Sequence, residues 1–91
     1  MASSTVSNIR ADKPELSKTE VLAAAHLAEA GAADYERISE AVGCAYATAN
    51  QCAQTLADVG YVTLSERQTD GRSRNPKVAT ATPALEAAAE S

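Results

Sequence analysis

The stretch from residue 34 to residue 62, DYERISEAVGCAYATANQCAQTLADVGYV, holds two short amphipathic patterns separated by a tight Gly-Cys-Ala turn. On both sides of the turn, apolar side chains recur every three or four residues, which is the spacing of one face of an α-helix. We therefore expect two helices, with Gly43 ending the first. Glycine tolerates the left-handed backbone that lets the next helix leave at a steep angle.

The second of these helices, predicted over residues 45–59, has two unlike faces. The face expected to pack inward contains Ala45, Ala49, Cys52, Ala53, Leu56 and Val59. The opposite face is polar but almost uncharged, with small residues near its N-terminal end, and it contains Ala47, Asn50, Gln51, Gln54 and Asp58. Such a face can enter a groove.

The composition limits the size and kind of the protein. The 91 residues allow one small domain, and without Phe or Trp the core must consist of closely packed helices around a few Leu, Val and Ile. We expect no large ligand pocket, no cofactor and no small-molecule ligand. A net charge of -4 argues against a uniformly basic nucleic-acid binder. The positive charge is concentrated late in the chain, at Arg67, Arg72, Arg74 and Lys77.

In chain order, residues 1–17 are polar with scattered apolar positions and are predicted to be a flexible arm. A helix is expected over residues 18–30, capped by a Ser or Thr ahead of Glu20 and stopped by Gly31. Asp34 is the expected cap of the next helix. After the helix at 45–59, strands at 61–66 and 77–82 form a hairpin, and a short C-terminal helix begins at Pro83 and ends near residue 90. The predicted domain is 18–82, followed by a helix or tail at 83–91.

This order, mainly α with a small β-hairpin, is that of a winged helix-turn-helix, and two segments resemble a known family. ISEAVGCAYATANQCAQTLADVGYV is similar to the helix-turn-helix of the MarR, ArsR and TrmB-like winged-helix regulators. DGRSRNPKVATATP resembles the wing of the same superfamily, and the resemblance covers about residues 18–85. It implies that Thr48, Asn50, Gln51 and Gln54 face the DNA groove, and that Arg72 and Arg74 contact the minor groove or phosphates. The full candidate DNA-binding set is Arg37, Tyr46, Ala47, Thr48, Asn50, Gln51, Gln54, Arg72, Arg74 and Lys77.

The chain also departs from the family pattern. Ala45 stands where a Ser usually caps the recognition helix, and no basic residue lies between Tyr46 and Val59. Contacts of Arg to guanine are therefore impossible from this helix. Asn or Gln to adenine and methyl contacts to thymine remain, so base preference should lean toward A·T.

Other functional classes find less support. One histidine, His26, and two cysteines, Cys44 and Cys52, form no metal-ligand set, and no catalytic or phosphate-loop motif is present, so an enzyme is not expected. Packing is the simpler role for His26 and Cys52, and a redox role for Cys44 is the less favoured reading. No apolar run is long enough for a membrane span and no signal peptide is visible, so we expect a cytoplasmic protein.

Two functions stay open. The basic wing favours a transcriptional regulator that binds double-stranded DNA, with helix 45–59 in the major groove and wing 67–77 on the backbone or minor groove. The acidic helix-turn-helix favours a module that binds protein instead. The exposed polar residues of the helix and the wing arginines have a plainer alternative role as solvated surface.

A homodimer is expected from the helix at 18–30. This helix has two apolar stripes, one of Val21, Leu22, Ala25 and Ala28 and a second of Ala23, Ala24, Leu27 and Ala30. The proposed dimer interface contains Ala23, Leu27, Ala30 and Leu85. The alternative is that the C-terminal segment folds back over this stripe and the protein stays monomeric.

Overall fold

The structure, a computed structural model, describes residues 2–66 and 77–90. In these residues the elements are α1 (Ala2–Asp12), α2 (Lys18–Ala30), β1 (Ala32–Asp34), α3 (Tyr35–Val42), α4 (Tyr46–Asp58), β2 (Val62–Glu66), β3 (Lys77–Ala81) and α5 (Pro83–Glu90). The chain is mostly helical with a small antiparallel sheet, which confirms the predicted fold class. None of the described helices has the length and hydropathy needed to cross a membrane.

Helices α2 and α3 begin and end where the sequence predicts. Ser17 and Glu20 form a reciprocal capping box at the start of α2, with Ser17 N–H donating to Glu20 Oε1 at 2.8 Å. At the start of α3, Asp34 Oδ1 accepts a hydrogen bond from Arg37 N–H at 2.8 Å. These caps satisfy backbone donors that a helix leaves unpaired.

The sheet has the order β1-β3-β2, and both pairings are antiparallel. In the predicted hairpin, Val62 lies opposite Ala81 and Leu64 opposite Ala79. The first strand was not predicted, because Ala-Ala-Asp is three residues long and lacks the β-branched or aromatic residues typical of strands. It adds to the other side of β3, where Ala33 pairs with Ala79.

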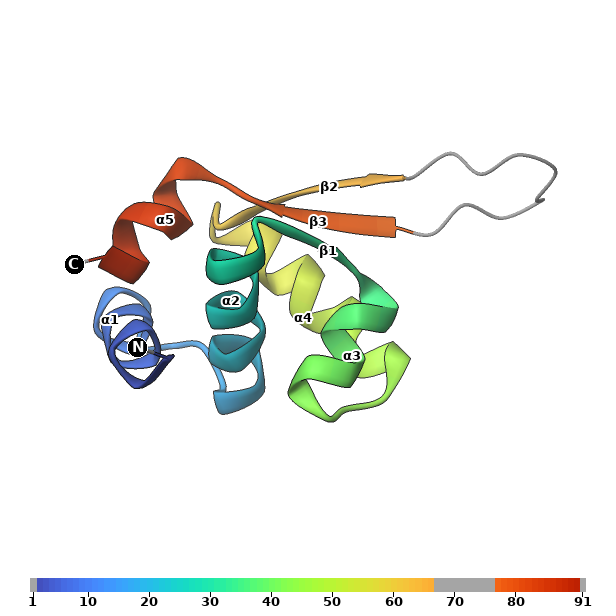
Figure 1. Ribbon diagram of the computed structural model, residues 1–91, viewed down its shortest axis with the longest axis horizontal. Helices are drawn as coiled ribbons and strands as arrows, with labels where there is room; N and C mark the ends of the chain where they lie inside the picture. The colour runs from blue at the N-terminus through green and yellow to red at the C-terminus, as the bar shows by residue number, and fades with distance from the viewer. Residues whose placement is uncertain (1, 67–76, 91) are drawn as a thin grey trace, which may run out of the picture.

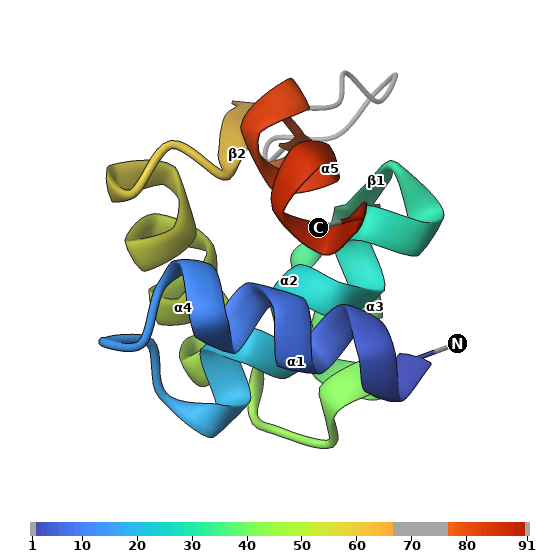
Figure 2. The ribbon, with the colours of Figure 1, turned by 90° about the vertical axis from the view of Figure 1, so that its left-hand side faces the viewer.

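Helix α2 lies at the centre of the molecule and packs against helices on several sides (Figures 1 and 2). Most residues of both apolar stripes are buried, which removes Val21, Ala23, Ala24, Ala25 and Leu27 from solvent, whereas Leu22 and Ala30 are exposed. Alanine methyl groups let neighbouring backbones approach closely. A chain without Phe or Trp can therefore still build a dense core.

The N-terminal segment differs from its prediction. Residues 2–12 form α1 rather than a flexible arm, and Ile9 on this helix is completely buried. Figure 2 shows α1 lying across α2, with α5 beside it at the same end of the molecule. Asn8 Nδ2 donates to the carbonyl of Ala89 in α5 at 2.7 Å, which ties the two ends of the chain together.

A second tie joins the end of α1 to the start of the hairpin. The Tyr61 hydroxyl donates to the Asp12 carboxylate, and Lys13 Nζ lies 6.0 Å from the centre of the Tyr61 ring. Burial, helped by this hydrogen bond, raises the pKa of the Tyr61 phenol. The position of α1 is therefore coupled to the base of β2.

These contacts also change the expected dimer interface. Ala23, Leu27 and Leu85 are completely buried within one chain, in which α1 and α5 both pack against α2. The premise that this stripe needs a second subunit is therefore wrong. Ala30 is exposed. A second copy, if it pairs, must use a surface other than the three buried side chains.

The packing of α1 yields a stability prediction. Replacing Ile9 with Ala should lower the free energy of unfolding by about 2–5 kcal/mol, because it removes buried methyl groups and leaves a cavity. The neighbouring Arg10→Ala, on the exposed side of the same helix, should change it by about 0.5 kcal/mol or less. Urea denaturation measures both. Equal, small effects of the two substitutions would show that α1 does not pack as described.

Candidate nucleic-acid interface

The turn between α3 and α4 is held by backbone hydrogen bonds. Gly43 has φ +78°, in the left-handed region, and its N–H donates to the Ser39 carbonyl at 2.8 Å. Cys44 N–H donates to the same carbonyl at 3.0 Å. This geometry ends α3 and redirects the chain into α4, as the glycine in the sequence predicts.

Helix α4 separates its buried and exposed residues by helical spacing. Ala49, Cys52, Ala53 and Leu56 are buried against the core. The exposed side contains Tyr46, Ala47, Thr48, Gln51, Gln54 and Asp58, and Asn50 is half-buried at its edge. The structure thus brings most of the candidate reading residues onto one continuous face of one helix.

One end position of this helix differs from the prediction, while the other packs as expected. Ala45 was expected to pack inward, but it is exposed at the N-cap position, where it makes no side-chain hydrogen bond. Val59 is half-buried against the core. The helical spacing holds from Tyr46 to Val59 and fails at Ala45, because the backbone there is extended rather than helical.

Tyr46, the first residue of α4, is 53% exposed and rests on a buried aromatic ring. Its ring centre lies 5.9 Å from that of Tyr35, with the planes tilted by 56°, a favourable geometry for two aromatic rings. The Tyr35 hydroxyl is buried with no hydrogen-bond partner among the described residues, and burial raises the pKa of this phenol. The buried Tyr35 ring therefore packs against the exposed Tyr46 ring.

The charge around the helix-turn-helix is acidic. Glu36, Glu40 and Asp58 are exposed, against one arginine, Arg37. Lys77, at the start of β3, is also exposed. The wing residues Arg72 and Arg74, on which the expected backbone contacts depend, lie outside the described residues.

The base of the hairpin is fixed by Thr82. Its hydroxyl oxygen lies 2.7 Å from the carbonyl oxygen of Gly60 and 3.0 Å from that of Tyr61, and its N–H donates to the Tyr61 carbonyl at 2.9 Å. The same oxygen lies 3.5 Å from Leu85 N–H, in the first turn of α5. One side chain thus joins the end of α4, the two strands and the C-terminal helix.

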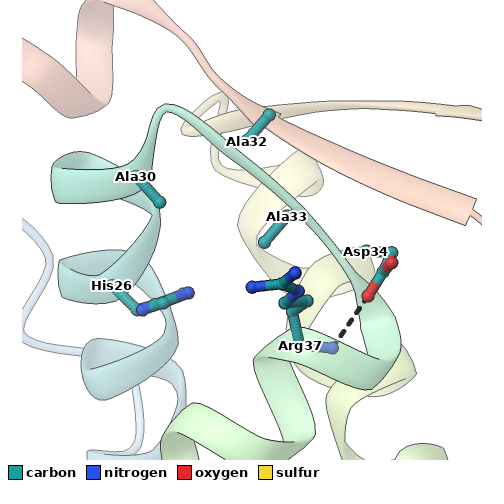
Figure 3. Close-up of a pocket in the computed structure, with 6 residues that line it drawn as sticks. All are labelled: His26, Ala30, Ala32, Ala33, Asp34 and Arg37. Carbon is teal, nitrogen blue, oxygen red and sulfur yellow. Dashed lines mark hydrogen bonds between the residues drawn. The ribbon is translucent and has the colours of Figure 1, made fainter.

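Arg37 does not lie on the exposed face of α4 with the other candidate DNA-binding residues of that helix. It lines a hollow of about 250 Å³ between α2, β1 and α3, together with His26, Ala30, Ala32, Ala33 and Asp34, and none of these residues belongs to α4 (Figure 3). The sequence predicted no such grouping, because its members come from three elements and no local spacing connects His26 with Arg37.

The cysteines take the places expected of packing residues. Cys52 is buried and Cys44 is half-buried, and both are free thiols. Burial raises the pKa of the Cys52 thiol, which keeps it in the less nucleophilic protonated form. Among the described residues, no group of three or more His, Cys, Asp and Glu side chains is arranged to bind a metal ion.

Comparisons of sequence find no relative: no family model matches the chain, and no curated protein matches it. Comparisons of structure find several regulators. A probable transcriptional regulator from Pseudomonas aeruginosa aligns with a TM-score of 0.72 and 22% identity, over 98% of this chain and 66% of that one. RV1404 from Mycobacterium tuberculosis aligns with a TM-score of 0.73 and 10% identity, over 97% of this chain and 58% of that one.

A third similar structure is BpsR of Bordetella bronchiseptica, whose DNA binding is regulated by 6-hydroxynicotinic acid. It aligns with a TM-score of 0.69 and 19% identity, over 94% of this chain and 61% of that one. The chain thus spans less than two thirds of the length of each of these three proteins. The likeness covers nearly all of this chain and establishes that it has the winged-helix fold of bacterial transcriptional regulators.

Proposed function

We propose that the chain binds double-stranded DNA as a small transcriptional regulator of the MarR-like kind, with α4 in the major groove and the wing on the backbone or minor groove. The observation that carries this proposal is the exposed face of α4. It is a continuous, nearly uncharged surface of small and amide side chains on the second helix of a helix-turn-helix. BpsR, which has the same fold, is a DNA-binding protein, and this supports the proposal.

The chemistry of this face favours A·T-containing sequences. Amide side chains such as Gln51 and Gln54 can pair with adenine, and the methyl groups of Ala47 and Thr48 can contact that of thymine. Fluorescence-anisotropy titration of A·T-rich and random duplexes at two salt concentrations tests the proposal. Tighter binding to the A·T-rich duplex is expected. Absence of binding to either duplex at low salt would contradict the proposal.

That negative result would favour the second function, a protein-binding module. The observation behind it is the acidic helix-turn-helix surface, where Glu36 and Glu40 are exposed on α3 in a chain of net charge -4. Such a surface repels phosphates and suits a basic partner protein.

The proposed base contacts lead to a prediction about specificity. Replacing Asn50 and Gln51 with Ala should reduce the preference for specific over random duplex by about 1–3 kcal/mol for each bidentate pair that is lost. Since Asn50 is half-buried, Gln51→Ala alone should account for most of the effect. The control Ser7→Ala, exposed on α1, should leave both affinities unchanged. Equal losses on both duplexes would assign these residues to backbone contacts instead.

A further prediction concerns the wing. Replacing Arg72 and Arg74 with Ala should weaken binding to all duplexes about equally and reduce the slope of log affinity against log salt by about one to two units, since each arginine neutralises about one phosphate. Arg10→Ala, at an exposed position of α1, is the charge-matched control for one arginine. A double variant with an unchanged salt slope would remove the wing from the interface.

A further inference from the structure

The hollow between α2, β1 and α3 has two basic side chains on opposite walls. His26 extends from α2 and Arg37 from α3, and Figure 3 shows the imidazole and the guanidinium both directed into the space between the helices. Within the part of the chain that the structure describes, neither side chain makes a hydrogen bond or an ion pair. Among these residues, the helices therefore hold two donor groups without a partner, both facing the same volume.

Asp34, the acidic residue in the lining, already accepts a hydrogen bond. Asp34 Oδ1 accepts from Arg37 N–H at 2.8 Å, so its carboxylate caps the first turn of α3. The amide donors and positive dipole at a helix N-terminus offset part of such a negative charge. The guanidinium of Arg37 and the N–H of His26 remain as the donors that face the hollow.

The rest of the lining is apolar and small. Ala30, Ala32 and Ala33 complete the lining of the hollow, whose volume of about 250 Å³ suits an ion of a few atoms or a short organic acid. These residues offer no hydrogen-bonding side chain. Polar recognition can come only from the His26 and Arg37 side chains, from the Asp34 carboxylate and from backbone groups.

We propose that this hollow is a binding site for a small oxyanion, a phosphate or a carboxylate, held between the Arg37 guanidinium and the His26 ring. Guanidinium groups bind both anions through two parallel N–H donors, and these charge-assisted bonds are among the stronger hydrogen bonds. Arg37 is exposed to solvent and Asp34 is nearby, so the affinity is modest, with a dissociation constant of about 1 mM. The site does not depend on the proposed DNA-binding function.

Nuclear magnetic resonance of the full chain tests the site directly, because His26 is the single histidine of the sequence. Inorganic phosphate, and acetate in a second series, is added at constant pH, with sodium chloride adjusted to hold the ionic strength constant. The imidazole signal of His26 and the backbone amide of Ala33 should shift and saturate with at least one of the two anions. The anion that saturates at the lower concentration identifies the preferred chemistry.

Two variants and one control make the assignment specific. Arg37→Gln should weaken binding by about tenfold or more, because it removes the charged donor pair. His26→Ala, followed through the Ala33 amide, should also weaken it. Arg10→Gln makes the same charge change at an exposed position of α1 and should leave the titration unchanged.

Several results would overturn the proposal. Shifts that grow linearly without saturating in the wild-type chain, or saturable shifts that Arg37→Gln leaves unchanged, would show that the hollow binds no oxyanion. A His26 shift caused by duplex DNA but by neither free anion would assign Arg37 to the DNA backbone instead of to this site.

Discussion

Burial of α2 on two sides is the constraint on which the rest of the structure depends. Val21 and Ala25 are buried on one stripe of this helix and Ala23 and Leu27 on the other, so the helix needs partners in more than one direction. Helices α3 and α4 pack against it on the side of the helix-turn-helix, and α1 and α5 cover it at the other end of the molecule (Figures 1 and 2). Because alanine fills most of these contacts, larger side chains there would overpack the core. The angle at which α4 is presented therefore depends on small residues in α2.

Strong local signals made the centre of the fold predictable from the sequence. Ser17 with Glu20, Asp34 and the glycines at 31 and 43 mark helix ends by hydrogen bonding and backbone conformation, which need no tertiary context. Helical spacing likewise predicted which residues of α4 are buried. Two elements were missed because tertiary contacts stabilise them. The polar sequence of α1 is held by Ile9 and the Asp12 to Tyr61 hydrogen bond, and β1 by its pairing with β3.

The candidate site was predictable to a similar degree. The exposed face of α4 follows from periodicity alone, so Thr48, Gln51 and Gln54 were placed correctly on the outside of one helix. The hollow at His26 and Arg37 could not be predicted, since it arises from the packing of α2 against α3. The burial of Leu27 within one chain was missed for the same reason, and this burial removed the argument for a dimer through that stripe.

In the proposed function, base contacts and electrostatic affinity come from different parts of the chain, because the charge is unevenly distributed. Helix α4 has no basic residue, so the role proposed for it is base contact rather than attraction to phosphate, which the exposed acids of α3 oppose. Electrostatic affinity must come from outside the helix-turn-helix, from Lys77 and the arginines between the strands. Tyr61 N–H donates to the Leu56 carbonyl in α4, and Thr82 joins the residues before β2 to α5, so the described base of the hairpin is fixed to α4.

The most direct measurement of the central claim is a map of backbone amide shifts in isotopically labelled protein as an A·T-rich duplex is added. The account predicts that shifts concentrate in residues 46–54 of α4 and at Lys77, while amides of α1 and α5, such as those of Asn8 and Ala88, stay unchanged. Shifts centred on α1 and α5, or none at a duplex excess in low salt, would contradict the account.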